Sequence, residues 1–282
     1  MFKHRTFQVR DFTLAALCHE PKTPSHIVIF VHGWLDNAAS FQPLMNEMSV
    51  RLPSANLISI DLPGHGLSSH AEAGFYPFHD YLDSLHQVML QIKSHSTCPI
   101  ALVGHSMGAL ITSCYSAAFP ENVDHLIQIE GYGPIWESEQ NALTRLRKGL
   151  LSRQRISKKP PRYFASFEEM LNLRAARYNL SSDLLLALVE RDAQHTPQGW
   201  QWRHDNRLKA QSLYRMSQEH ANQVTQALPC SNLLILGESG FSDLKTNIPT
   251  KANILQVKGG HHCHLSAAKL VANSIITQIS PS

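Results

Sequence analysis

The segment Val-Gly-His-Ser-Met-Gly at residues 103–108 places a serine between two glycines, each two positions away. Glycines at these positions allow a sharp turn from a strand into a helix, which would expose the Ser106 hydroxyl as a nucleophile. The backbone N–H of Met107 would then begin the helix, where donors are unpaired and the dipole is positive, so it could stabilise an oxyanion. Apolar residues before the motif and a helix-forming run after it favour this interpretation over a serine in an ordinary turn.

A nucleophilic serine requires a base, and a histidine-rich motif lies near the end of the chain. Gly-Gly-His-His-Cys-His at residues 259–264 offers His261, His262 and His264 after the last strand-like run. A histidine on this loop would accept the Ser106 proton and later donate it to the leaving group. We expect no metal at these histidines, because no carboxylate accompanies them in the sequence.

The elements that must position these residues alternate between strands and helices. Residues 7–20 alternate apolar and polar side chains, which indicates an antiparallel pair of strands. Beyond them, β-branched runs alternate with helical patterns, which predicts a mostly parallel sheet with helices on both faces. The strand-like runs are 26–31, 56–61, 99–105, 124–130, 232–237 and 253–258, and the helical ones are 40–52, 78–92, 107–119 and 265–279.

This alternation stops between residues 134 and 228. Helical stretches follow one another there, and we find no convincing strand. The sequence therefore predicts a core of residues 1–133 and 229–282 that is interrupted by a helical cap of residues 134–228. Residues 144–162 of this cap carry eight Lys and Arg and no acid. This basic run is typical of a solvated surface, with a landing site for an anionic substrate group as the alternative.

The composition predicts a globular protein without a membrane span. The 282 residues are 43% hydrophobic and 17% charged, and the net charge of +3 is too small to argue for nucleic acid. No apolar run is long enough for a signal peptide or a membrane helix. The five cysteines are scattered and form no C-x-x-C pair, so we expect a reducing, cytoplasmic location; they are Cys18, Cys98, Cys114, Cys230 and Cys263.

The order of the motifs resembles the α/β-hydrolase superfamily over nearly the whole chain. The matching segments are residues 30–34, 60–68, 103–108 and 259–264. Within the superfamily, residues 32–41, 199–208 and 259–265 resemble the serine-hydrolase-like subgroup, which is related in layout to haloalkane dehalogenases but has a serine nucleophile. The resemblance implies an α/β fold with a mostly parallel eight-stranded sheet, helices on both faces, a helical cap inserted after the sixth strand, and no metal or organic cofactor.

The resemblance also implies roles for residues outside the serine motif. The loop at His32-Gly33-Trp34 would supply a second oxyanion donor, which is the backbone N–H of Trp34. The base directly follows a pair of small residues in the family, and this selects His261 over His262. The side chains expected to line the substrate pocket are Trp34, Leu35 and Phe41.

The triad acid has two places in this family. The common one follows the seventh strand, in a pattern of glycine, two residues and aspartate, but here Gly237 leads to Gly240. The other, which certain haloalkane dehalogenases use, follows the sixth strand, where Glu130 ends an apolar run. A carboxylate there is costly to leave unpaired, and a hydrogen bond to the imidazole would offset that cost. We therefore expect Glu130 to be the acid, with Asp243 as the second choice and Glu238 as the third.

The resemblance implies a serine hydrolase that cleaves a small-molecule carboxylic ester or thioester through an acyl-enzyme. Dehalogenases and epoxide hydrolases of the superfamily use an aspartate nucleophile, which Ser106 argues against. Two alternatives stay open at this point. One is a carbon–carbon bond hydrolase with the same triad, and the other is a catalytically weak or inactive binding protein that retains the fold.

Overall fold

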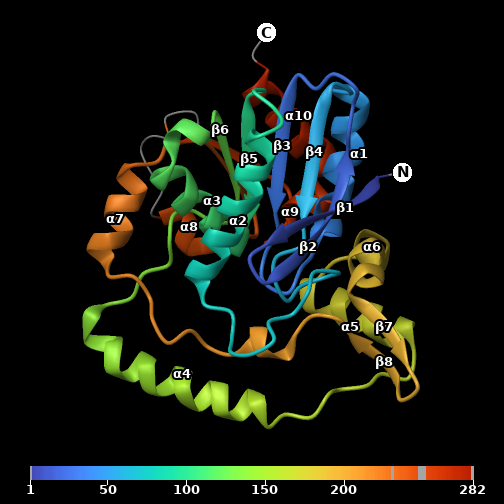
Figure 1. The fold of residues 1–282 in the computed structure, drawn as a ribbon, viewed down its shortest axis with the longest axis vertical. Helices are drawn as coiled ribbons and strands as arrows, with labels where there is room; N and C mark the ends of the chain where they lie inside the picture. The colour runs from blue at the N-terminus through green and yellow to red at the C-terminus, as the bar shows by residue number, and fades with distance from the viewer. Residues whose placement is uncertain (1, 230–231, 247–251, 281–282) are drawn as a thin grey trace.

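The computed structural model describes residues 2–229, 232–246 and 252–280, and its centre is an eight-stranded sheet (Figure 1). The strand order is β1-β2-β4-β3-β5-β6-β9-β10. β2 pairs antiparallel with β1 and β4, and all the other neighbours are parallel. The strands are β1 Lys3–Val9, β2 Phe12–His19, β3 His26–Val31, β4 Ala55–Ile60, β5 Ile100–His105, β6 His125–Ile129, β9 Asn232–Gly237 and β10 Asn253–Val257. The predicted mostly parallel sheet is confirmed.

Helices cover both faces of this sheet, as predicted. Central strands such as β3 and β5 are buried on both faces, which explains their continuous apolar sequences. One face packs against α1 Gln42–Arg51 and α10 Ala268–Ile279, and the other against α2 Phe78–Lys93 and α3 Met107–Ala118. Short elements complete the core: η1 Ala38–Phe41, η2 Pro120–Asn122, α8 Ser242–Thr246 and α9 Cys263–Ser266.

The segment between β6 and β9 forms a separate layer beyond the carboxyl ends of the strands (Figure 1). Its elements are η3 Glu139–Asn141, α4 Ala142–Ser157, α5 Phe167–Tyr178, α6 Ser182–Asp192, β7 Ala193–Thr196, β8 Gly199–Trp202, η4 Asn206–Lys209 and α7 Gln218–Gln226. We call residues 134–228 the cap. Its α5, α6 and β7 bury an apolar cluster of their own, which includes Met170, Leu188 and Val189.

The expectation that the cap lacks strands is wrong, because β7 and β8 form a two-stranded antiparallel hairpin. Each strand has four residues, and β7 follows α6 without a break, so no alternating pattern marks it in the sequence. Gly199, with φ of 123°, follows the two-residue turn at Pro197 and Gln198 and has a backbone conformation that favours glycine.

Buried polar contacts join the cap to the core. Arg191 of α6 forms an ion pair with Asp61, which follows β4, at 2.9 Å, and the two side chains are 6% and 0% exposed. Asp61 also accepts hydrogen bonds from the backbone N–H groups of Ala38 and Leu67. The Asp205 carboxylate of the cap accepts a hydrogen bond from the Tyr76 hydroxyl of the core at 2.7 Å.

Among the described residues, no helix is long and apolar enough to cross a membrane. Four of the cysteines are free thiols, namely Cys18, Cys98, Cys114 and Cys263. Cys230 lies outside the described residues.

The Arg191–Asp61 pair gives a test of how the cap is held. Replacing Arg191 with Met leaves the Asp61 carboxylate buried without its cation, so the free energy of unfolding should fall by about 3–5 kcal/mol. Arg155→Met is the matched control, because Arg155 is exposed on α4 and should change stability by less than about 0.5 kcal/mol. Urea denaturation followed by circular dichroism measures both. Equal stabilities of the two variants would contradict a structural role for the pair.

Candidate active site

Ser106 occupies a strained turn between β5 and α3. Its φ and ψ are 51° and −118°, a conformation that non-glycine residues rarely adopt and that costs about 1–3 kcal/mol. The backbone N–H of Ser106 donates to the Ile129 carbonyl at 2.9 Å, which fixes the turn against β6. Met107 is the first residue of α3, so its N–H belongs to the helix turn that lacks intrahelical acceptors.

The two glycines of the serine motif are required by close packing. A Cβ atom at Gly104 would lie 2.5 Å from the backbone nitrogen of Ala109, and one at Gly108 would overlap the carbonyl oxygen of Val31. Neither position therefore tolerates a side chain while α3 starts so close to β3 and β5. The predicted strand-to-helix turn is present for this reason.

The loop after β3 packs directly on Ser106. A Cβ atom at Gly33 would lie 3.0 Å from His105 Nδ1 and 3.2 Å from Ser106 Cβ, so the backbone around Trp34 borders the serine. His32 holds this loop in place. Its Nδ1 donates to the Gly33 carbonyl at 2.8 Å, and its Nε2 accepts from the Leu62 N–H at 3.0 Å. Burial lowers the pKa of His32, which fits this neutral, structural form.

His261 and Glu130 lie together at the same edge of the sheet. His261 Nδ1 is 3.2 Å from Glu130 Oε2. Glu130 directly follows β6 with φ of 51°, and its two carboxylate oxygens accept backbone hydrogen bonds from Gly237 at 2.7 Å and Phe241 at 3.1 Å. The Phe241 ring covers the His261 imidazole, with 4.2 Å between the ring centroids.

The glycine at position 240 is explained by this carboxylate. A Cβ atom at Gly240 would overlap both oxygens of Glu130. The carboxylate from β6 therefore fills the space beside the loop after β9, where the resemblance places the more common acid. Asp243 lies in the short helix α8, and Glu238 is exposed. The carboxylate hydrogen-bonded to His261 is that of Glu130.

The Ser106 hydroxyl makes no hydrogen bond to His261 among the contacts of the described residues. Such bonds are often long in enzymes without substrate and shorten in the complex. His261 Nδ1 faces Glu130, so its Nε2 is the nitrogen left for a reacting group.

Comparison with known proteins identifies the fold. Residues 26–239 match the family model described as the alpha/beta hydrolase fold. The protein belongs to the α/β-hydrolase fold family. The chain is 28% identical over 280 residues to "Serine hydrolase-like protein" of Danio rerio, covering 92% of this chain and 83% of that protein. It is 30% identical over 269 residues to "Probable serine hydrolase" of Drosophila melanogaster, covering 88% and 79%. These relatives place it in the serine-hydrolase-like subgroup.

A solved structure agrees with this assignment of the fold. The thioesterase domain from the curacin biosynthetic pathway superposes with a TM-score of 0.83, at 22% identity, over 98% of this chain and 99% of that one. The eight-stranded sheet of this α/β hydrolase thus follows a known arrangement.

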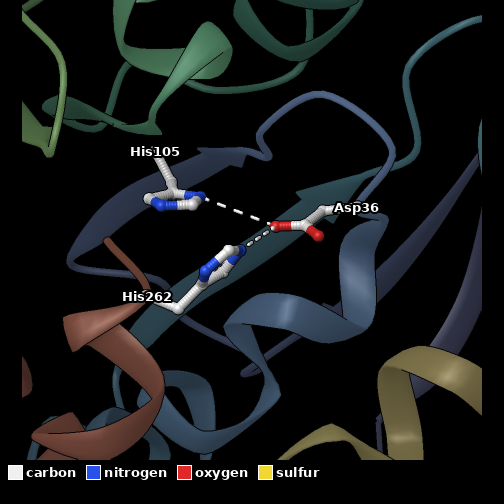
Figure 2. A group of neighbouring side chains, drawn as sticks. All are labelled: Asp36, His105 and His262. Atoms are coloured by element: carbon white, nitrogen blue, oxygen red, sulfur yellow. Dashed lines mark hydrogen bonds and ion pairs between the residues drawn. The ribbon is translucent and has the colours of Figure 1, made fainter. Parts of the chain in front are cut away.

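A buried cluster of polar side chains in this hydrolase consists of Asp36, His105 and His262 (Figure 2). Asp36 Oδ2 is 3.3 Å from His262 Nε2 and 3.6 Å from His105 Nδ1. All three side chains are less than a tenth exposed. His105 and His262 are the chain neighbours of Ser106 and His261, so the cluster adjoins the candidate nucleophile and the candidate base.

Burial and neighbouring groups shift the pKa values in this cluster. Burial, followed by the adjacent histidines, lowers the pKa of His105 well below its usual value and that of His264 to about 3. Burial by itself raises the pKa of Asp36, but the charge and hydrogen bond of His262, with His105 and Arg174, hold it below the ordinary range. Asp36 is therefore an ionised carboxylate in the interior of this hydrolase.

Sequence reasoning missed Asp36 and Phe241. Asp36 lies in the segment 32–41 that carries the resemblance, shortly after Trp34. The sequence could have indicated its role only by a carboxylate placed next to a turn that was expected to be buried. Phe241 contacts the site through its backbone N–H and its ring. Its residue type does not indicate either contact in the sequence. Of the three expected pocket residues, Trp34 is 42% exposed and Leu35 3%. Phe41 is completely buried between Phe30 and His264, which does not support its expected role in the pocket.

Part of the basic run, residues 144–162, contacts other residues of the chain. Arg145 pairs with Glu137 at 2.7 Å, and Arg153 and Arg162 stack over Phe75 and Phe164, at 4.7 and 4.6 Å. A cavity of about 200 Å³ lies near Arg153 between the cap and the core, and Ser106 is not among its lining residues.

Gly240→Ala tests the packing of Glu130. The added methyl group would collide with the carboxylate, so the free energy of unfolding should fall by about 1–3 kcal/mol. Ser239→Ala is the control, because Ser239 is the exposed neighbour in the same loop and should change stability by less than about 0.5 kcal/mol. Chemical denaturation gives both values. A Gly240→Ala protein as stable as the control would contradict this placement of Glu130.

Proposed function

We propose that this hydrolase cleaves a small-molecule carboxylic ester or thioester through an acyl-enzyme, with Ser106, His261 and Glu130 as its triad. The observation that carries the proposal is the 3.2 Å contact between His261 and Glu130 at the edge of the sheet where Ser106 is held in a strained turn. This contact leaves Nε2 of His261 for the Ser106 proton.

In the proposed mechanism, His261 removes the Ser106 proton as the hydroxyl oxygen attacks the carbonyl carbon of the substrate. Glu130 orients the imidazole and stabilises its cationic form. The backbone N–H groups of Trp34 and Met107 bind the oxyanion, and removing one such donor typically costs about 2.7–4 kcal/mol of transition-state stabilisation. His261 then protonates the leaving alcohol or thiol, and a water molecule hydrolyses the acyl-enzyme by the reverse sequence.

The network around Glu130 supports its role as the acid. Two backbone N–H groups hold the carboxylate in place next to the imidazole. The exposed ring of Phe241 covers His261 and limits access of water to the imidazole. We include thioesters with oxygen esters as candidate substrates because the structurally similar curacin domain is a thioesterase.

A serine-reactive fluorophosphonate probe tests the nucleophile. The folded wild-type chain should be labelled once, and Ser106→Ala should lose the label while its circular dichroism spectrum is retained. Ser116→Ala is the matched control, because Ser116 is a buried serine of α3 outside the site, and it should be labelled like the wild type. Absence of label on folded wild-type protein would overturn the proposal and favour a binding protein. A panel of p-nitrophenyl esters and acyl-CoA thioesters of varied length then defines the substrate class.

The choice of acid is tested by two isosteric changes. Glu130→Gln should lower kcat/KM by about 10³–10⁴-fold, because a neutral amide does not stabilise an imidazolium and its NH2 group would face a backbone N–H donor such as that of Gly237. Asp243→Asn should retain activity within about threefold, which is less than 1 kcal/mol. A dead Asp243→Asn enzyme with a fully active Glu130→Gln enzyme would reverse the assignment.

Moving the acid between the two strands gives a sharper test. Glu130→Gly removes the carboxylate and suits the positive φ at that position. Adding Gly240→Asp to this variant places a carboxylate on the loop after β9, in the space that Glu130 vacates. The double variant should be at least about tenfold more active than Glu130→Gly. This gain corresponds to about 1.4 kcal/mol of transition-state stabilisation. A double variant no more active than Glu130→Gly would show that the two positions are not equivalent.

A further inference from the structure

The buried cluster next to Ser106 has the composition and spacing of a metal site. The ligand atoms of Asp36, His105 and His262 all lie within 4.8 Å of one another. Two tetrahedral zinc ligands at about 2.0–2.1 Å from the ion are about 3.3 Å apart, and the separations from Asp36 Oδ2 are 3.3 and 3.6 Å. We infer that Asp36, His105 and His262 bind one divalent transition-metal ion, for which Zn²⁺ is the probe.

The orientation of His105 supports this inference. Its Nε2 donates to the His261 carbonyl at 2.8 Å, so its Nδ1 carries a lone pair. That nitrogen is buried, has no hydrogen-bond partner among the described residues, and faces the Asp36 carboxylate. Two electron-rich atoms that face each other are best accommodated by a cation between them. An imidazole that donates its other N–H to a carbonyl is also the usual form of a metal-binding histidine.

The space around His105 Nδ1 is kept open by a missing side chain. A Cβ atom at Gly33 would lie 3.0 Å from this nitrogen, tighter than ordinary van der Waals contact. The second oxygen of Asp36 accepts from the Tyr178 hydroxyl at 2.6 Å, which fixes the carboxylate as outer partners of metal ligands do. Figure 2 shows both imidazoles directed at one carboxylate oxygen of Asp36.

The local charge balance favours an additional cation. Arg174 lies 3.9 Å from Asp36 and 3.1 Å from Asp192, so two buried carboxylates share one guanidinium. A further cation next to Asp36 would be stabilised by this carboxylate, because a buried charge is costly to leave without a full counter-charge. A metal ion between the imidazoles would supply that cation.

The inference departs from the expectation based on the sequence, which was that the histidines of residues 259–264 lack a carboxylate partner. Asp36 supplies that partner from the loop after β3. His264 lies against His105, with 4.1 Å between the ring centroids, and neither of its ring nitrogens has a hydrogen-bond partner among the described residues.

The proposed ion would connect the two halves of the catalytic machinery. His105 directly precedes Ser106, and His262 directly follows His261. A metal bound to both would fix the serine turn against the loop of the base and restrict the movement that brings His261 to Ser106. We therefore expect Zn²⁺ to inhibit hydrolysis, and this consequence rests on the proposed function, whereas binding of the ion does not.

Metal binding is measured on the full chain after treatment with a chelator. Equilibrium dialysis against Zn²⁺, with metal content from mass spectrometry, should give one tightly bound ion per chain. Asp36→Asn and His262→Gln should each weaken its affinity at least about 100-fold. His204→Gln is the matched control, because His204 is also a buried histidine on a carboxylate, 2.6 Å from Asp192, and its affinity for Zn²⁺ should stay that of the wild type.

X-ray absorption identifies the ligands directly. The spectrum of the loaded protein should show imidazole nitrogen and carboxylate oxygen at about 2.0–2.1 Å. His105→Gln provides a third variant if Asp36→Asn fails to fold, as judged by circular dichroism. Failure of the wild type to retain one ion, or equal affinity in the wild type and the ligand variants, would overturn the proposal and assign any bound zinc to other histidines.

Activity is a separate readout. If the hydrolase proposal holds, Zn²⁺ should slow ester hydrolysis by the wild type in proportion to occupancy, and chelation should restore the rate. A chain that binds zinc as expected but is never labelled by the fluorophosphonate probe would refute the hydrolase proposal and retain the metal site. A chain that the probe labels but that does not bind zinc stoichiometrically would refute the metal site and retain the hydrolase proposal.

Discussion

The Glu130 carboxylate is the contact on which the organisation of the candidate site depends. It is 1% exposed, and it is held by the backbone N–H groups of Gly237 and Phe241. These donors belong to β9 and the loop after it, whereas Glu130 directly follows β6, so the carboxylate joins the two strands that flank the cap insertion. Its contact with His261 adds the loop after β10. One buried charge thereby fixes three segments that are distant in sequence.

Backbone strain gathers at the same edge of the sheet. Leu35, Ser106 and Glu130 have φ values of 62°, 51° and 51°, and they follow β3, β5 and β6, which are neighbours in the sheet. Non-glycine residues adopt such values only where the surrounding structure imposes them. Each of these turns redirects the chain beyond the end of a strand. They place the candidate oxyanion donor, the candidate nucleophile and the carboxylate at the same edge of the sheet. Open α/β sheets bind their ligands in this region.

Asp36 extends this organisation into the cap. Its carboxylate contacts His262 and His105 on the core side and Tyr178 of α5 on the cap side. Tyr178 also stacks on His262, with 3.9 Å between the ring centroids. The loop of the candidate base is therefore packed against both layers. A displacement of α5 would be transmitted to this loop through Tyr178 and Asp36. The Arg191–Asp61 pair holds the same two layers together nearby.

The sequence by itself determined the core sheet, its helices and the serine turn, because these depend on local periodicity and on glycines next to Ser106. It also ranked Glu130 first among the acids, since a glutamate at the end of a buried strand requires a partner. The hairpin β7–β8 could not be predicted, because its four-residue strands follow a helix without an alternating pattern. Tertiary structure alone decided that Glu130 occupies the space beside Gly240, and that Asp36 meets His105 and His262. These contacts join residues more than 60 positions apart in sequence, and only the packing of the sheet edge brings them together.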